Sequence, residues 1–294
     1  MDTFTHLILT KFNTRSFQGG GKGCDPEWLN YRFKLFDRFC FPSVCNQSNQ
    51  NFKWLIFFDV NTPDEYKQRI KSYSKFKNFL PIYLDFVLPY GTFPDELRQV
   101  LQPHIGTSEY LITTWLDNDD AICQDYIHMI QNNFDRQQSE SINFLSGYQL
   151  YNSKLYLDFE MSTHFISLIE KYNPESFNTV LARDHNHLFE VCSSVRNVIC
   201  KPSWVEVLHG NNVMNVYRKG VRVPVKSNLE SFSIELDEEA VQGDKERFSF
   251  VLEQIKIFAL LPYSYARKIY FIITHPKFSI LNFFRELRIQ SYPK

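Results

Sequence analysis

A run of apolar and β-branched residues that ends in acidic side chains decides the fold: residues 109–122 read E-Y-L-I-T-T-W-L-D-N-D-D-A-I. The seven residues 110–116 have the composition of a buried strand rather than of a helix. The carboxylates of Asp117, Asp119 and Asp120 follow directly. Because ligands of open α/β sheets bind beyond the carboxyl ends of the strands, we expect a ligand at this cluster.

The acidic cluster has two interpretations. Three carboxylates within four residues repel one another, and they become favourable when a divalent cation, which prefers oxygen ligands, lies between them. The alternative is a solvated turn whose Asp caps the next helix, since Asp is a good N-cap. One Asp is enough for a cap, so three favour a metal site. An EF-hand is excluded because Ile122 stands where that loop needs glycine.

The overall composition narrows the class of protein. The chain has 294 residues, enough for one large core or for one domain with an appendage. Its formal net charge of −1 gives no bias toward nucleic acid as a partner. We expect no secretory signal, and no window reaches the roughly 18 apolar residues of a spanning helix. The six cysteines contain no C-x-x-C pair, so a reduced, cytoplasmic setting is expected.

Strands and helices are predicted to alternate along the first half of the chain. Asp25 is expected to cap a helix that has Pro26 in its first turn and that Pro42 ends or bends. Thr62 and Glu65 form a capping box for another helix. Further helices are expected at residues 93–101 and 122–134, and strands at residues 6–10, 52–58, 82–88, 110–116, 141–146, 150–159 and 203–208. This alternation predicts an α/β fold with a mostly parallel sheet sandwiched by helices.

The pattern changes in the last quarter of the chain. We therefore predict one domain over residues 1–215 and a C-terminal loop and helical appendage over residues 216–294, helical from Phe248 onward. Residues 245–294 hold nine Lys and Arg against three Glu, interleaved with aromatic residues. Two interpretations stay open: a peripheral membrane contact with anionic lipid, or an appendage that packs on the sheet with its basic side chains in water.

Five segments carry a resemblance to a known family. A strand that ends in D-x-D-D, fourth in an alternating α/β array, resembles the GT-A glycosyltransferases, whose D-x-D element holds a metal and a nucleotide sugar. The segments L-T-K-F-N-T-R (9–15), R-F-C-F-P-S-V (38–44), N-F-K-W-L-I-F-F-D (51–59), I-T-T-W-L-D-N-D-D-A-I (112–122) and W-V-E-V-L-H-G-N-N (204–212) look like the family of putative rhamnosyltransferases. The likeness covers about the first three-quarters of the chain.

The resemblance implies a metal-dependent transferase with a GT-A-like, Rossmann-like fold. It would move a sugar, rhamnose by the family's name, from a nucleotide-sugar donor to a glycan or lipid-linked acceptor. The cofactor would be Mn²⁺ or Mg²⁺, held by Asp119, Asp117 and His209, with Asp120 as a further ligand or a ribose contact. Bound metal would stabilise the departing diphosphate as a Lewis acid.

The resemblance also implies the other roles in the site. The residues expected to bind the nucleotide sugar are Thr10, Asn13, Arg15, Asp59, Asp117 and Asp120. The acceptor hydroxyl needs a base, for which Asp184 is the first candidate, with Glu206 and Asp158 in reserve. For Asp59 and Asp184 a simple turn or helix cap is nearly as good an explanation.

Two rival functions stay open. A sugar nucleotidyltransferase would use a similar sheet and metal, but such enzymes have a Gly-rich signature with Arg and Lys after the first strand, and F-N-T-R-S-F at residues 12–17 is not one. A non-catalytic nucleotide- or carbohydrate-binding protein on this fold would bind without transfer. The acidic cluster argues against the second rival.

Overall fold

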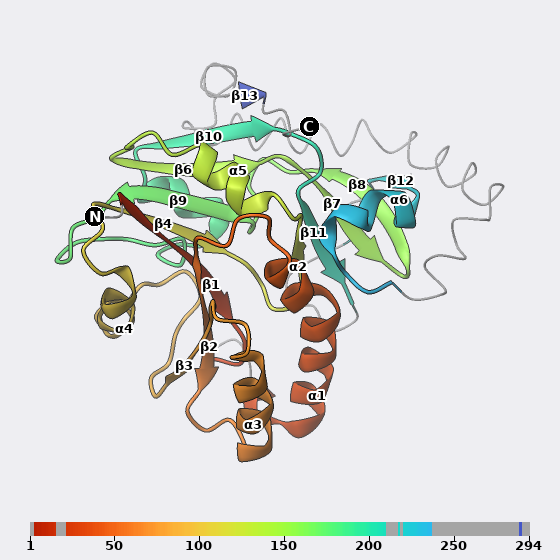
Figure 1. Ribbon diagram of the computed structural model, residues 1–294, viewed down its shortest axis with the longest axis horizontal. Coiled ribbons are helices and arrows are strands. Elements are labelled where there is room, and N and C mark those ends of the chain that lie inside the picture. The colour runs from red at the N-terminus through yellow and green to blue at the C-terminus, as the bar shows by residue number, and fades with distance from the viewer. Residues whose placement is uncertain (1–2, 16–21, 210–216, 218–219, 237–287, 290–294) are drawn as a thin grey trace.

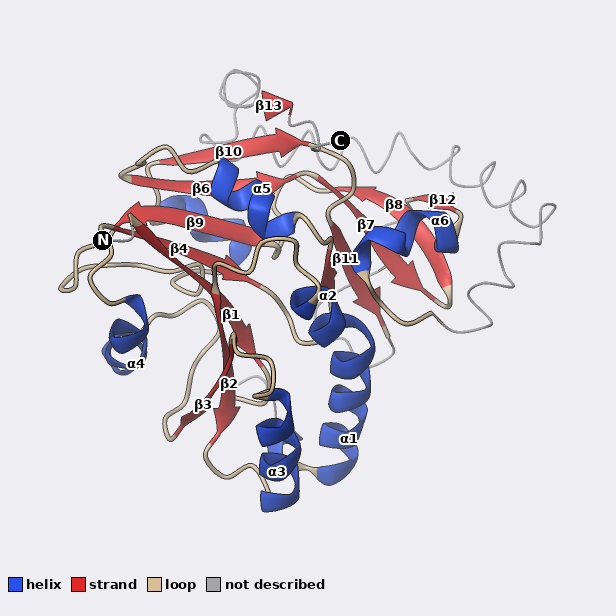
Figure 2. Cartoon of the chain, viewed as in Figure 1, coloured by secondary structure: helices blue, strands red, loops and turns tan. Residues whose placement is uncertain are grey.

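Two β-sheets that lie side by side form the framework of the protein (Figure 1). The structure, a computed structural model, describes residues 3–15, 22–209, 217, 220–236 and 288–289. One sheet has eight strands and the other has five. Helices lie against both faces of the larger sheet, as the sequence predicts (Figure 2).

The larger sheet is mostly parallel, which confirms the predicted fold class. Its order is β13 (Arg288–Ile289), β10 (Ser194–Ile199), β6 (Ser139–Phe144), β9 (Ile166–Lys171), β4 (Tyr110–Trp115), β1 (Phe4–Lys11), β2 (Lys53–Asp59) and β3 (Phe79–Leu84). Only β9 runs antiparallel to its neighbours, β4 and β6, among these described strands. The sequence pattern predicts neither β9 nor β10, and β9 is the strand that joins the two halves of the sheet.

Alternate residues of each central strand enter two separate cores. Ile8 of β1 packs in one core, and Leu7 and Leu9 pack in the other. The first core is covered by α1 (Pro26–Leu35), α2 (Phe41–Cys45), α3 (Asp64–Tyr73) and α5 (Tyr126–Asn132), and the second by α4 (Asp95–Ile105). Both faces of β1 and β4 are therefore apolar, as expected for central strands of a covered sheet.

Helix α1 begins as predicted but does not stop at the predicted place. Asp25 Oδ1 accepts a hydrogen bond from the amide of Trp28 at 2.9 Å. A π-helical turn (Phe36–Cys40) then leads directly into α2, which contains Pro42 in its first turn. A proline is tolerated there because its missing N–H and fixed φ suit a helix start. The helical segment therefore does not end at Pro42, and the helix type changes from π to α one residue before this proline.

The smaller sheet corrects two predictions. Its order is β12 (Val221–Val223), β8 (Lys154–Phe159), β7 (Ser146–Tyr151), β11 (Trp204–Leu208) and β5 (Ala121–Ile122). The single strand predicted at residues 150–159 is a hairpin, because Asn152 and Ser153 turn the chain with φ of 48° and 59°. The helix predicted from residue 122 starts at Tyr126, since Ala121 and Ile122 pair with β11 instead.

Residues beyond 215 contribute to this framework where the structure describes them. Strand β12 pairs with β8, and α6 (Val225–Leu229) follows it. Phe232, in a 3₁₀ turn (Glu230–Phe232), packs against Tyr148. The boundary at residue 215 stays a prediction. The helices predicted from Phe248 and the basic aromatic segment lie outside the described residues, apart from β13.

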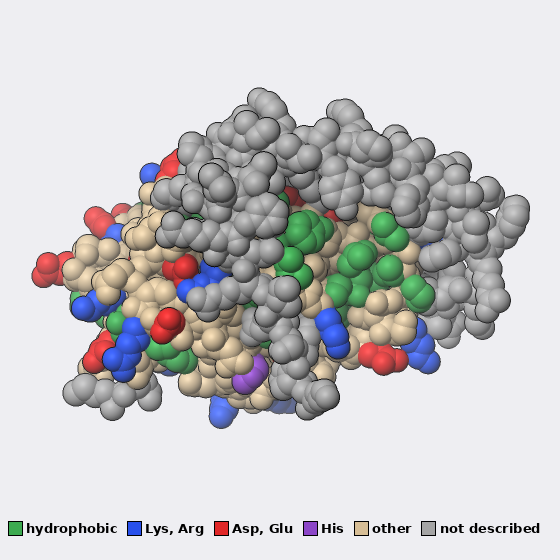
Figure 3. Space-filling model, turned by 90° about the horizontal axis from the view of Figure 1, so that it is seen from above, with side chains coloured by type: hydrophobic (Ala, Val, Ile, Leu, Met, Phe, Trp, Pro, Cys, Tyr) green, Lys and Arg blue, Asp and Glu red, His purple; other side chains and the backbone are tan. Residues whose placement is uncertain are grey.

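Acidic and basic side chains are mixed on the face of the molecule that Figure 3 shows. None of the helices in the described ranges is long and apolar enough to cross a bilayer.

The contact between Gly147 and Trp204 holds the smaller sheet together. A Cβ on Gly147 would lie 2.0 Å from the indole Cδ2, so the ring occupies the space of a side chain. The Trp204 ring also stacks on Phe165 at 5.1 Å, and its Nε1 donates to the carbonyl of Phe144 at 2.8 Å. This packing fixes the chain beside His164.

We predict that Gly147→Ala destabilises the protein by about 1–3 kcal/mol, the usual effect of overpacking a core. The added methyl group must displace the buried indole of Trp204. Urea denaturation measures the free energy of unfolding, and Ser146→Ala, one residue earlier on β7, is the matched control. Equal stability of the two variants would contradict this account.

Glu170 of β9 makes the stability of the folded protein depend on pH. Burial raises the pKa of its carboxyl to about 7, although a hydrogen bond from the Asn178 amide and the charge of Arg98 lower it. A group with a raised pKa stabilises the folded state most below its unfolded pKa of 4.5, and this contribution is lost as the pH rises through 7.

We therefore predict that wild type loses stability relative to Glu170→Gln between pH 4.5 and 8, by up to about 3 kcal/mol. Glutamine keeps an oxygen that can accept from Asn178 and cannot ionise. Urea denaturation at several pH values measures the difference. Parallel pH profiles for the two proteins would show that Glu170 titrates normally.

Candidate functional site

The acidic loop, residues 117–120, connects the two sheets. It leaves β4 of the larger sheet and enters β5 of the smaller one. Asn118 Nδ2 donates to the carbonyls of Lys11 and Phe12, at 3.1 and 3.0 Å, which ties the loop to the end of β1. The amide of Val207 donates to Asp120 Oδ1 at 2.8 Å, which ties it to β11. The loop is thus fixed from both sides.

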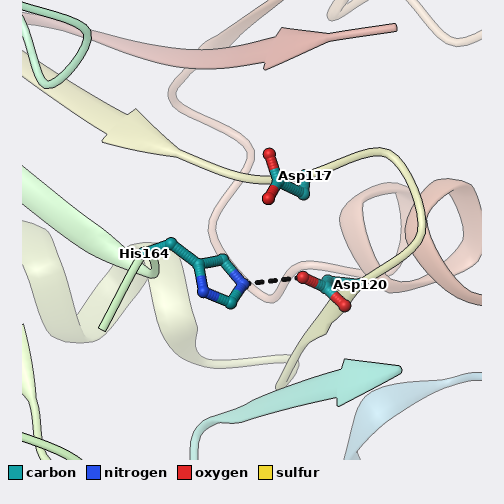
Figure 4. A group of neighbouring side chains, drawn as sticks. All are labelled: Asp117, Asp120 and His164. Atoms are coloured by element: carbon teal, nitrogen blue, oxygen red, sulfur yellow. Dashed lines mark hydrogen bonds and ion pairs between the residues drawn. The ribbon is translucent and has the colours of Figure 1, made fainter. Parts of the chain in front are cut away.

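Asp117, Asp120 and His164 form one group, here called the acid–histidine group (Figure 4). One ligand atom from each residue lies within 4.8 Å of the other two. His164 Nε2 lies 2.7 Å from Asp120 Oδ2, and Trp115 Nε1 donates to Asp117 Oδ1 at 2.8 Å. Two carboxylates and an imidazole are a suitable donor set for a divalent metal ion.

Burial and mutual contact shift the pKa values of Asp120 and His164. Burial raises the pKa of Asp120, and the charge of Asp119 raises it further, although His164 opposes the shift. Burial alone would lower the pKa of His164, but the hydrogen bond to Asp120 and the charges of Asp117 and Glu206 raise it. The pair of Asp120 and His164 therefore holds a proton more strongly than either side chain would in water.

Asp119 points to a second set of partners. Its Oδ2 lies 2.8 Å from His209 Nε2 and accepts from Arg32 Nη1 at 2.9 Å. Arg32 also donates to Asn118 Oδ1, and its side chain is 14% exposed. Burial alone would raise the pKa of Asp119, but Arg32 and His209 hold it well below its usual range. The charge of Asp119 is thus already compensated by the protein.

We predict that Arg32→Met destabilises the protein by about 3–5 kcal/mol, because it leaves the carboxylate of Asp119 buried without a counter-charge. The double variant with Asp119→Asn should recover most of this loss. Lys34→Met, on the exposed side of α1, is the matched control. Chemical denaturation of wild type, Arg32→Met, Asp119→Asn and the double variant measures the coupling, and additive losses in the double variant would disprove the pairing.

Three of the six residues predicted to bind the nucleotide sugar, Asn13, Arg15 and Asp59, gather beyond the ends of β1 and β2, whereas Asp117 and Asp120 lie in the acidic loop. Arg15 Nε lies 3.1 Å from Asp59 Oδ2. Asn13 Oδ1 accepts from the Asp59 amide at 3.2 Å, and its Nδ2 donates to Thr62 Oγ1 at 2.9 Å. Thr10 is fully buried and accepts from the indole of Trp54, so it supports the strand beneath.

Thr62 does not cap α3 as predicted. Its hydroxyl donates to the carbonyl of Asp59 at 2.7 Å, and the helix begins at Asp64 without a side-chain cap. The capping box is wrong because the hydroxyl instead closes the turn that follows β2. This turn holds Asp59 at the edge of the sheet.

Of the three candidate bases, the structure gives solvent access to Asp184. Its side chain is 25% exposed, and its Oδ1 lies 2.9 Å from His185 Nδ1. The His185 ring lies 6.0 Å from that of His164, beside the acid–histidine group. Glu206 is fully buried in β11, where it accepts from Gln149 at 2.6 Å, and Asp158 is buried in β8.

The site also contains residues that sequence reasoning missed. His164 and Arg32 lie 44 and 87 residues from the carboxylates that they contact. Arg32 belongs to the polar positions of an amphipathic helix, where a solvated side chain is the ordinary expectation. Neither residue stands in a local motif, so no signal in the sequence could have found it.

Comparison with known families identifies the class of enzyme. Residues 23–220, about two-thirds of the chain, match a family described as "Putative rhamnosyl transferase". The match includes the acidic loop and every strand from β2 to β11, and the chain belongs to this family. The predicted glycosyltransferase class is thereby confirmed. Residues 9–15, the first of the five similar segments, precede the matched range. No curated protein matches the chain.

Solved structures resemble the chain only weakly. Residues 1–349 of TarS from S. aureus, in complex with UDP, are 10% identical with a TM-score of 0.41, covering 69% of this chain and 60% of that one. A "Putative Glucose-1-Phosphate Thymidylyltransferase" from Bacillus anthracis, in complex with sucrose, is 12% identical with a TM-score of 0.32, covering 68% and 88%. The chain thus spans about three-fifths of the TarS fragment's length. Likenesses this weak carry no argument about function.

Proposed function

We propose that this glycosyltransferase moves rhamnose from a nucleotide-sugar donor to a hydroxyl of a glycan or lipid-linked acceptor, with a divalent cation at the acid–histidine group. The observation that carries the proposal is this group itself: ligand atoms of Asp117 and Asp120, on the loop that follows the carboxyl end of β4, lie within 4.8 Å of one another and of a ligand atom of His164, which precedes β9. Rhamnose rests on the family description alone.

The cation is assigned to the acid–histidine group rather than to Asp119 and His209, two of the ligands expected from the sequence. Asp119 already shares its charge with Arg32, which a metal would have to displace. Asp117 and Asp120 form no ion pair with an arginine or lysine among the described residues. The imidazole nitrogen of His164 favours Mn²⁺ over the harder Mg²⁺. When bound, such an ion supplies Lewis-acid stabilisation of a departing diphosphate.

The remaining residues bind the donor and move the proton. Arg15 and Asp59, at the ends of β1 and β2, face the position of the nucleoside and its phosphates. Transfer forms a bond between the acceptor oxygen and the anomeric carbon and breaks the bond from that carbon to the diphosphate. The acceptor hydroxyl loses its proton to the carboxylate of Asp184, which the contact with His185 orients.

Neither rival function has an observation in its favour. The family match favours transfer over nucleotidyl chemistry. A non-catalytic binding protein would bind nucleotide without turnover, which the assay below distinguishes. A cytoplasmic location stays a prediction. A lipid contact of the basic C-terminal segment also stays a prediction, since most of that segment lies outside the described residues.

We predict that one of UDP, GDP and dTDP binds the protein only when Mn²⁺ is present, as measured by calorimetric titration. Asp120→Asn and His164→Ala should each weaken this Mn²⁺-dependent nucleotide binding by about 100-fold or more. EDTA should abolish both this binding and turnover of the matching nucleotide sugar. Asp135→Asn, which changes an exposed carboxylate in a turn, should behave as wild type.

The same titrations separate the two candidate metal sites. If Asp119→Asn removes Mn²⁺-dependent binding while folded Asp120→Asn keeps it, the assignment to the acid–histidine group is wrong. If no nucleotide binds folded wild type with or without metal, the proposed function itself falls.

A further inference from the structure

Lys11, the last residue of β1, carries a charge that has no hydrogen-bond partner in the part of the chain that the structure describes. Its Nζ is buried and donates no hydrogen bond to any described residue. Lys53, on the neighbouring strand, shows the contrast, because its Nζ donates to the carbonyl of His104 at 2.6 Å. A buried ammonium without hydrogen bonds is costly, so a reason for its presence must lie elsewhere.

Aromatic rings form the surroundings of the Lys11 ammonium. Its Nζ lies 5.2 Å from the centre of the Tyr90 ring and 5.5 Å from that of Trp115. Cation–π contacts of this kind stabilise a charge by about 0.5–2 kcal/mol each, less than the cost of burying it. Burial lowers the pKa of Lys11 to about 8, with the charge of Asp117 opposing the shift, so the side chain remains mostly charged at pH 7. Among the described residues, none accepts a hydrogen bond from its three N–H donors.

The position of Lys11 places this charge at the candidate donor site. Its carbonyl accepts from Asn118 of the acidic loop, and Trp115, which it faces, donates to Asp117. Lys11 and the acid–histidine group are therefore neighbours through Asp117. Once a divalent cation neutralises Asp117 and Asp120, the ammonium loses its nearest counter-charge. A bound anion is the partner that would then satisfy it.

We propose that Lys11 binds the diphosphate of the nucleotide-sugar donor and is a specificity-determining residue for that group; this inference rests on the proposed function. Phosphate oxygens carry negative charge and accept hydrogen bonds, which matches three donors on a point charge. Nucleoside and sugar hydroxyls need no such charge. Lys11 also faces the charge that grows on the diphosphate as the sugar departs, so it stabilises the leaving group.

The direct test uses inorganic pyrophosphate as the probe, with Mn²⁺ present, in calorimetric titrations of the full chain. Lys11→Met removes the charge and keeps a long apolar side chain between the two rings. We expect pyrophosphate binding to weaken by about tenfold to 100-fold, the usual effect of losing a charged hydrogen bond. Lys77→Met, at an exposed turn, is the matched control and should bind as wild type.

A stability measurement separates a ligand-binding role from a structural one. If Lys11 serves a ligand, Lys11→Met without ligand should melt no lower than wild type, because a buried charge is exchanged for an apolar group. Lys11→Gln provides a second uncharged variant if the first does not fold. A lower melting temperature in both variants, with pyrophosphate affinity unchanged, would overturn the inference.

Competition distinguishes the donor from other sources of a diphosphate, such as a lipid-linked acceptor. UDP, GDP or dTDP, whichever binds wild type, should displace pyrophosphate, and the matching nucleoside should bind Lys11→Met as it binds wild type. Failure of the nucleoside diphosphate to compete would overturn the assignment to the donor.

The two hypotheses can fail separately. Unchanged pyrophosphate binding in folded Lys11→Met, with Mn²⁺-dependent nucleotide binding intact in wild type, would remove the role of Lys11 and leave the proposed function standing. A wild type that binds neither pyrophosphate nor nucleotide would remove both.

Discussion

Electrostatic repulsion among three neighbouring carboxylates is the constraint on which the rest of the structure depends. Asp117, Asp119 and Asp120 cannot be buried together unless each has its own compensation. The fold separates them: Asp119 turns to Arg32 and His209, Asp120 to His164 and the Val207 amide, and Asp117 accepts from Trp115. Only the first of these arrangements includes an arginine. The other two carboxylates contact a histidine and an indole N–H instead, and they are the proposed ligands of a divalent cation.

The architecture of two sheets makes this separation possible. A loop on one sheet would direct neighbouring side chains into one environment, whereas residues 117–120 cross from β4 to β5 and meet partners from both sheets. Helix α1 brings Arg32 from one side, and β11 brings the Val207 amide from the other. Contacts with both sheets hold the loop in place for the same reason. With the proposed cation bound, a loop held in this way would stabilise a departing anion without reorganisation.

Much of the fold was predictable from the sequence, and the exceptions have physical reasons. Strand β4 and the acidic loop follow from local composition, and the cap of α1 follows from Asp25 and Pro26. The hairpin between β7 and β8 was missed because its turn uses two non-glycine residues with positive φ, which carry little sequence signal. Strand β9 was missed because its antiparallel place inside a parallel sheet depends on pairing with β4 and β6.

By itself the sequence determined the type of each strong element and the place of the acidic loop, because periodicity, caps and charge density act over a few residues. It also determined the family, through segments that keep their order along the chain. Only the tertiary structure decided which carboxylate has which partner. Arg32, His164 and Lys11 come to the loop from 44 to 107 residues away in the chain, through strand pairing and helix packing. Contacts over such separations leave no local pattern, so the division between Asp119, paired with Arg32, and the acid–histidine group, which has no arginine partner among the described residues, exists only in the folded chain.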